Sequence, residues 1–133
     1  MTQKENTKKV MFENRKIEPV FTDDRGSIFD LIEEKVSHVG IITFNKGVTR
    51  ANHYHKESVQ YSYILEGKIK LAISDIDGTD KKEIILEPGM LTTIPPKMVH
   101  VYTALSKAVM IDITTMSRKD NGYEEDTVRM SIK

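Results

Sequence analysis

Residues 47–67 read GVTRANHYHKESVQYSYILEG, and no other segment of the chain says as much about its fold. Within it, one residue separates His53 from His55. If this pair lies on a β-strand, both imidazoles point to the same face. Two imidazoles on one face can share a metal ion, or one can act as a base that the other orients. Taken alone, the pair is better explained as two surface histidines in a polar loop, because polar and charged residues flank it.

Short apolar runs separated by turn signals extend away from this segment. Residues 68–74 (KIKLAIS) alternate charged and apolar side chains, as in a half-buried strand. Several short strands, with no sustained helical periodicity in the central region, predict a β-sandwich or a closed barrel. The predicted strands cover residues 36–44, 60–65, 68–74, 83–86, 91–94 and 108–115. Residues 29–35 suggest a short helical turn, and residues 117–133 a short helix or an edge strand.

The composition is that of one small globular domain. The chain has 133 residues, no cysteine, and 20 basic against 20 acidic side chains. The lack of cysteine excludes disulfides and thiolate metal sites, and the balanced charge gives little reason to expect nucleic-acid binding. No stretch approaches the roughly 20 apolar residues of a membrane helix. We therefore predict a cytoplasmic protein with no membrane partner, a flexible arm at residues 1–9 and one domain over residues 10–133.

The spacing of glycine, histidine and proline forms two patterns. Five residues separate Gly47 from the histidine pair, and four more precede Gln60. Downstream, Gly89 is followed after five residues by Pro95, and then after four more by His100. Together the two patterns resemble, in order and spacing, the two motifs of the cupin superfamily.

The resemblance to the cupins implies a fold and a site. The expected fold is all-β, a single-domain jelly-roll barrel (a double-stranded β-helix). The residues expected to meet in its mouth are His53, His55 and His100.

Three positions depart from the cupin motifs. Gln60 stands where the usual metal ligand is acidic, Lys97 where a glycine is usual, and Ala104 where an asparagine is usual. Three neutral imidazoles and an amide oxygen leave the charge of a divalent ion uncompensated, and glutamine binds such ions less well than a carboxylate does. For this chain, the resemblance is therefore weaker support for a bound metal than it is for a cupin with the usual acidic ligand.

Within the cupins, the chain is most similar to dTDP-sugar 3,4-ketoisomerases and, more distantly, to dTDP-4-dehydrorhamnose 3,5-epimerases. The resembling segments are residues 24–28 (DRGSI), 47–56 (GVTRANHYHK), 94–100 and 123–129 (YEEDTVR). The ketoisomerases also carry a glutamine at the position of Gln60. This resemblance implies an isomerase or epimerase of a nucleotide-linked keto-sugar in polysaccharide or glycoconjugate biosynthesis. It also implies a homodimer and no required cofactor.

The chemistry of such an enzyme assigns catalytic roles to residues of this chain. A ketone acidifies the neighbouring carbon, so a base can remove a proton and return it elsewhere through an enediolate. By matching position, His53 is the principal base, and His55 is a second acid/base or the group that orients it. Tyr61 or Tyr63 is the expected donor to the oxyanion, although a tyrosine here is more often part of the barrel wall.

Four further residues are predicted to contact the substrate. The guanidinium groups of Arg25 and Arg50 match phosphate in geometry, and the resemblance adds Gln60 and His100. For Arg25, pairing with a neighbouring aspartate at the surface explains the sequence equally well. Arg50 is favoured as functional because it precedes His53 by three residues.

Two other functions fit the same residues. The first is a metal-dependent cupin, a dioxygenase or metal-assisted isomerase, in which His53, His55, Gln60 and His100 bind Zn, Fe, Mn or Ni. The second is a non-catalytic cupin that binds a small ligand or a saccharide. Two polar residues have no assigned role. His38 has no motif around it and is interpreted as structural or surface, whereas Asp112 either orients a histidine or faces water.

Overall fold

The computed structural model describes residues 10–130, and the predicted arm at residues 1–9 lies outside them. Strands are the main secondary structure of the described chain, which also contains one short helix. Its elements are β1 (Glu13–Lys16), β2 (Phe21–Asp23), β3 (Gly26–Ile28), β4 (His38–Phe44), β5 (Thr49–His55), β6 (Gln60–Glu66), β7 (Ile69–Ser74), β8 (Lys82–Leu86), β9 (Met90–Ile94), β10 (Val99–Ala104), β11 (Ala108–Thr114), α1 (Gly122–Asp126) and β12 (Thr127–Arg129). Among these residues, no helix is long and apolar enough to cross a membrane.

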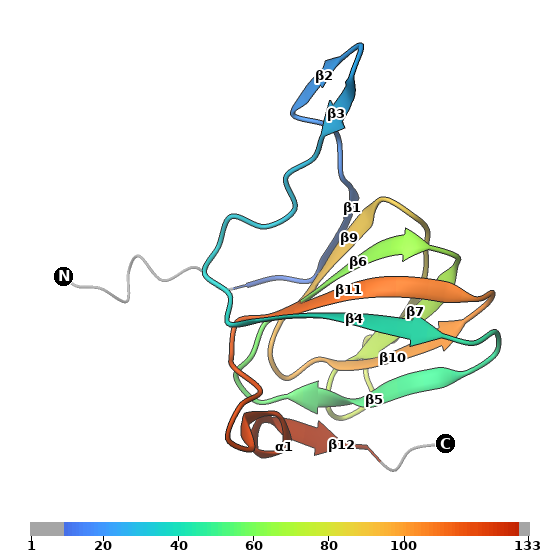
Figure 1. Cartoon of the computed structure of the whole chain (residues 1–133). Helices are drawn as coiled ribbons and strands as arrows, with labels where there is room; N and C mark the ends of the chain where they lie inside the picture. Colours follow the sequence, from blue (N-terminus) through green and yellow to red (C-terminus); the bar gives the residue numbers. More distant parts are fainter. Residues whose placement is uncertain (1–9, 131–133) are drawn as a thin grey trace.

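Two five-stranded antiparallel sheets form the body of the molecule. Their strand orders are β1-β9-β6-β11-β4 and β12-β5-β10-β7-β8. The predicted all-β jelly-roll fold is confirmed. A third sheet consists of β2 and β3 alone, and this hairpin projects away from the two larger sheets (Figure 1).

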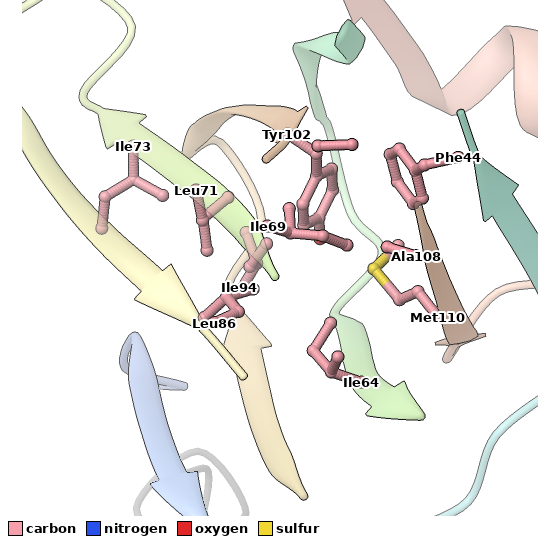
Figure 2. Packing of buried hydrophobic residues seen from close by; sticks show 11 residues of the cluster. Phe44, Ile64, Ile69, Leu71, Ile73, Leu86, Ile94, Tyr102, Ala108 and Met110 are labelled. Atoms are coloured by element: carbon pink, nitrogen blue, oxygen red, sulfur yellow. The ribbon is translucent and has the colours of Figure 1, made fainter. Parts of the chain in front are cut away.

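The hydrophobic core lies between the two large sheets (Figure 2). Strand β7 illustrates how the sequence builds this core. Its residues Ile69, Leu71 and Ile73 are buried and alternate with more exposed residues, so one face of the strand is apolar. Opposite them, Ile64 and Met110 come from the other sheet and are fully buried. Each such side chain contributes roughly 1.5–3 kcal/mol through its removal from water.

Two strands change character along their inward faces, and this change positions the site. On β6 the inward residues are Gln60, Ser62 and Ile64. On β11 both Asp112 and Met110 point inwards, and Met110 pairs in register with Ile64. The interior is therefore polar near the start of β6 and apolar near its end.

The sequence predicted the strands better than the irregular segments. All six predicted strand regions contain a strand, but β1, β2, β3 and β10 were not predicted. Residues 29–35 form no helix, which corrects that prediction. The C-terminal segment contains both predicted alternatives, the short helix α1 and the strand β12, which pairs with β5 at the edge of the sheet.

Candidate functional site

A bulge in β5 aims the histidine pair into the barrel. His53 pairs with His100 across β5 and β10, but the next pair joins Val101 to Ala51, so the ladder skips Asn52. Ala51 and Asn52 have φ angles of 79° and 67°, in the left-handed region. A bulge of this kind re-aims the following side chain, and for alanine the left-handed region is strained. As a result His53 and His55 are both buried on one face.

Three buried imidazoles meet at the polar end of the barrel. The ring centroid of His53 lies 4.8 Å from that of His55 and 4.8 Å from that of His100. The rings of His55 and His100 are 5.3 Å apart. Two neighbouring strands of one sheet thus bring together the three histidines that the motifs picked out.

Burial keeps these histidines neutral at neutral pH. It lowers the pKa of His53 to about 4, with a smaller contribution from His55 nearby. It lowers the pKa of His100 to about 3, and His53 adds to that effect. Burial also lowers the pKa of His55, although hydrogen bonding to Gln60 opposes it. A neutral imidazole has one nitrogen lone pair that can accept a proton.

His100 presents such a lone pair to the interior. Its Nδ1 lies 3.1 Å from the carbonyl oxygen of Met98, which can only accept, so Nδ1 carries the hydrogen. The Nε2 atom is therefore an acceptor. It is buried and has no hydrogen-bond partner among the described residues.

His55 is held on both sides. Its Nε2 lies 3.0 Å from Oε1 of Gln60. Its Nδ1 lies 3.3 Å from the hydroxyl of Thr127 and 3.5 Å from a carboxylate oxygen of Asp126. In contrast, the ring of His53 makes no hydrogen bond within the described part of the chain, and lies beside the ring of Tyr123 at 6.1 Å.

Asp112 faces inwards, which answers the question that the sequence left open. Its side chain is fully buried, and Oδ1 accepts a hydrogen bond of 2.7 Å from the Gln60 amide nitrogen. Its Oδ2 lies 2.8 Å from the Arg118 guanidinium. Burial raises the pKa of Asp112, while the charge of Arg118 opposes that shift.

Arg118 and Tyr123 were missed by sequence reasoning. The Arg118 guanidinium stacks 4.6 Å from the centre of the Tyr123 ring, and both residues line the cavity beside His53. A buried carboxylate at Asp112 signals that some cation must be near, but the sequence does not say which one. Tyr123 and Asp126 lie within the resembling segment 123–129, for which the sequence suggested no role.

Tyr61 and Tyr63 lie on the wrong face for the predicted donor role. Along β6 the inward residues are Gln60, Ser62 and Ile64, so the two tyrosines between them point out of the barrel. The pKa of Tyr61 is raised by partial burial and by Glu34, a residue outside the barrel strands.

Tyr102 instead occupies the interior next to the histidines. Its ring centroid lies 5.9 Å from that of His100, and its hydroxyl lies 2.6 Å from the hydroxyl of Ser62. Burial raises the pKa of Tyr102, so the phenol stays protonated.

The two predicted phosphate-binding arginines have different surroundings. Arg50 lines a cavity of about 140 Å³ together with His53 and Tyr123, and its guanidinium donates to the carbonyl oxygen of Thr43 at 3.1 Å. Arg25 lies in the projecting hairpin and pairs with Asp23 at 2.7 Å. Within this chain Arg25 does not line the cavity, and its pairing matches the alternative that the sequence offered.

His38 lies closer to the site than the sequence indicated. It is on the inward face of β4 and its charge would act on Asp112 and Arg118. Its ring packs against Gly40, where an added Cβ would lie 3.1 Å from His38 Cε1. The absence of a side chain at residue 40 therefore leaves room for this imidazole.

The residues present fit a metal ion only in part. One ring nitrogen from each of His53, His55 and His100 lies within 4.8 Å of the others. However, His55 Nε2 and Gln60 Oε1 bond to each other, and the Gln60 nitrogen bonds to Asp112. Neither His55 Nε2 nor Gln60 can bind a metal without breaking this arrangement, and no carboxylate takes the place of Gln60. The site therefore fits the divalent ion that the cupin motifs usually hold only if the hydrogen bond between His55 and Gln60 breaks.

Comparison with protein families decides the family. A model described as the cupin domain matches residues 40–114, which run from β4 to the end of β11. The chain belongs to the cupin family. The match includes all three clustered histidines of this cupin, together with Gln60 and Asp112. A search of curated proteins finds no match to the sequence.

Solved structures with the same fold include several sugar-modifying enzymes. A sugar 3,4-ketoisomerase from Thermoanaerobacterium thermosaccharolyticum, in complex with TDP, is 22% identical with a TM-score of 0.74, covering 90% of this cupin and 88% of that chain. A 3,4-ketoisomerase from Helicobacter canadensis is 21% identical with a TM-score of 0.74, covering 90% of each chain. A dTDP-4-dehydrorhamnose 3,5-epimerase from Sulfolobus tokodaii is 19% identical with a TM-score of 0.69, covering 92% of this cupin and 82% of that chain. The predicted resemblance to these two enzyme groups is confirmed at the level of the fold.

Proposed function

We propose that this cupin is an isomerase or epimerase that moves protons next to the carbonyl of a nucleotide-linked keto-sugar. The observation that carries the proposal is His53, a buried and neutral imidazole that has no hydrogen-bond partner in the described chain and lines the cavity. A base that is not already bonded to protein is free to take a proton from a ligand. The structural neighbours support the substrate class, since the 3,4-ketoisomerase from Thermoanaerobacterium thermosaccharolyticum was solved with TDP and, as a point mutant, with TDP-4-keto-6-deoxyglucose.

The proposed reaction balances without a redox step. His53 removes the proton from the carbon beside the ketone, and the electrons of that C–H bond form an enediolate whose charge lies on the former carbonyl oxygen. Protonated His53 returns its proton to the former carbonyl carbon, and the neighbouring hydroxyl proton passes to the former carbonyl oxygen, so the carbonyl moves by one carbon. Return of the proton to the opposite face of the original carbon gives an epimer instead. Of the residues that line the cavity, Arg118 has the guanidinium donors best suited to an oxyanion.

Binding of the nucleotide is assigned to the open side of the cavity. Arg50 is exposed there, and its guanidinium lies 5.5 Å from the ring centre of Phe44 and is a suitable partner for phosphate. The proposed reaction requires no metal, because His53 supplies the base and Arg118 supplies the donor to the oxyanion. The hydrogen bond between His55 and Gln60 also occupies two groups that a metal ion would need.

The proposed enzyme is a homodimer. The β2–β3 hairpin exposes Phe21 by 51% and Ile28 by 56%. An isolated two-stranded hairpin is marginally stable in water, and a second copy could cover this one. Light scattering at several protein concentrations tests the dimer independently of activity.

A metal-dependent reaction is the second candidate. It is favoured by His100, whose buried Nε2 has no hydrogen-bond partner among the described residues. That reaction would require His55 to turn away from Gln60. The variant His53→Ala distinguishes a non-catalytic binding role from both candidates. If the protein only binds a ligand, the variant would bind it unchanged, and the wild type would show no turnover.

The test measures metal content and ligand-dependent stability on protein purified without a metal-affinity tag. The proposal predicts little transition metal per chain by mass spectrometry. It also predicts a higher melting temperature with dTDP or a dTDP-sugar, because a ligand that binds only the folded state stabilises it. Near-stoichiometric metal without a nucleotide effect would overturn the proposal in favour of the metal-dependent candidate.

A further inference from the structure

Five side chains form one hydrogen-bonded and ionic path through the polar end of the barrel. It runs from Arg118 to Asp112 at 2.8 Å, to Gln60 at 2.7 Å and to His55 at 3.0 Å. It continues from the other ring nitrogen of His55 to Asp126 at 3.5 Å. We propose that Asp112, paired with Arg118, is a positioning residue that fixes the Gln60 amide and so holds neutral His55 as its Nε2–H tautomer.

The direction of each hydrogen bond follows from Asp112. A carboxylate paired with a guanidinium can only accept hydrogen bonds. The Gln60 atom that faces Asp112 is therefore the amide nitrogen, and the carbonyl oxygen of the same amide faces His55. That oxygen accepts, so His55 Nε2 carries the hydrogen.

The far side of His55 favours the opposite tautomer. A carboxylate oxygen of Asp126 lies 3.5 Å from Nδ1 and would be best satisfied if Nδ1 carried the hydrogen. The Thr127 hydroxyl, 3.3 Å away, can donate to Nδ1 when that nitrogen is a bare acceptor. His55 thus lies between two competing partners, and the shorter contact to Gln60 decides between them.

The tautomer sets what the cavity can do. With Nε2–H bonded to Gln60 and Nδ1 turned to Thr127, His55 offers no free lone pair to a ligand. His53, whose ring centroid lies 4.8 Å from that of His55, is then the histidine that can act as the base. This catalytic consequence rests on the proposed keto-sugar reaction, whereas the tautomer does not.

The test reads the tautomer directly by NMR of ¹⁵N-histidine-labelled full-length protein at neutral pH. The chain has four histidines, so His55→Asn identifies the signals of His55 by their disappearance. The proposal predicts a hydrogen-bearing Nε2 and a bare Nδ1 at His55 in the wild type. A wild-type His55 that is Nδ1–H, or doubly protonated, would overturn it whether or not any variant folds.

Asp112→Asn is predicted to switch the tautomer. The carbonyl oxygen of the new side chain would turn to Arg118 and its amide nitrogen to Gln60, so the Gln60 amide would flip and present its own nitrogen to His55. The Nε2 atom would then be bare and Nδ1–H would face Asp126. A folded Asp112→Asn protein that keeps Nε2–H at His55 would contradict the proposal.

A compensating variant and a matched control complete the test. Adding Gln60→Glu to Asp112→Asn restores an acceptor in front of both His55 and the new amide at position 112, so Nε2–H is predicted to return. Thr114→Val, on the same strand, removes a buried hydroxyl that donates to Met116 at 2.8 Å but leaves the path intact. It is predicted to leave the tautomer unchanged.

Turnover supplies a second readout if the keto-sugar reaction is found. Asp112→Asn is predicted to lower kcat on the order of 10- to 100-fold with little change in KM, as for other partners that orient a functional histidine. The compensating variant is predicted to recover part of that loss. Without turnover the proposed function fails, yet the NMR result still decides the tautomer.

Discussion

The two ends of the barrel interior share strands β6 and β11 but differ in the polarity of their buried side chains. The polar end contains His53, His55, Gln60, His100 and Asp112, and the apolar end contains Ile64, Ile69, Leu71, Leu86 and Met110. Tyr102 lies at the boundary. Its hydroxyl bonds to Ser62 on the polar side, and its ring packs edge-on to Phe44, 6.3 Å away, within the hydrophobic core.

The difference shows how a small barrel divides stability from function. The apolar end gains free energy from removing side chains from water. The polar end gains far less, because each buried polar group must recover in hydrogen bonds what it loses in hydration. The buried Nε2 of His100 has no hydrogen-bond partner within the described chain, so its lost hydration is not compensated. The requirements of folding alone do not explain this cost.

Truncation at the apolar end should give the largest loss of stability. Leu71→Ala leaves a cavity at a fully buried position, and we expect a loss of about 2–5 kcal/mol in the free energy of unfolding. Urea denaturation measures this loss. The matched control is Ile85→Ala on the neighbouring strand β8, where the side chain is 43% exposed and the change should be about 0.5 kcal/mol or less. Equal losses in the two variants would contradict the assignment of the core.

Acid should destabilise the protein through the polar end. Folding lowers the pKa of His53 from 6.5 to about 4 and that of His100 from 6.5 to about 3. Between these values and 6.5 the unfolded state binds more protons, so the free energy of unfolding falls as the pH falls through that window. Each histidine contributes a slope of up to roughly 1.4 kcal/mol per pH unit. His53→Gln should show a shallower acid dependence than the wild type, and an unchanged slope would show that His53 is not held neutral by burial.

Relief of the strained bulge should give the smallest effect, with opposite sign. Ala51 has a φ of 79°, which glycine adopts without the cost paid by alanine. We expect Ala51→Gly to raise the free energy of unfolding by up to about 1 kcal/mol. Ala72→Gly, at an extended position in β7, is the control and should lower it by about 0.5–1 kcal/mol. Destabilisation of the same size in both variants would show that the bulge is unstrained.

The sequence predicted the site where local rules apply. Period-two geometry correctly placed His53 and His55 on one face, and the same rule, applied from Gln60, would have turned Tyr61 and Tyr63 outwards. The glycine usually found at the position of Lys97 also has a local reason. Lys97 adopts a φ of 66°, in the left-handed region that favours glycine.

The remainder of the site depends on the paths of irregular segments. Arg118 reaches Asp112 from the segment between β11 and α1, whose course no periodicity encodes. Arg25 lies in the β2–β3 hairpin, which projects away from the two large sheets, and no periodicity in the sequence encodes that placement. A carboxylate within an apolar strand could be recognised at Asp112, but its orientation required knowing which cation lay near it.

The most direct test of the central claim follows proton transfer by NMR in deuterated water with TDP-4-keto-6-deoxyglucose as the probe. We predict that the wild type incorporates deuterium beside the carbonyl, or moves the carbonyl by one carbon, and that His53→Asn does so on the order of 100-fold more slowly. Exchange at the rate of the protein-free control in the wild type, or at the wild-type rate in His53→Asn, would contradict the assignment of the polar end as a proton-transfer site centred on His53.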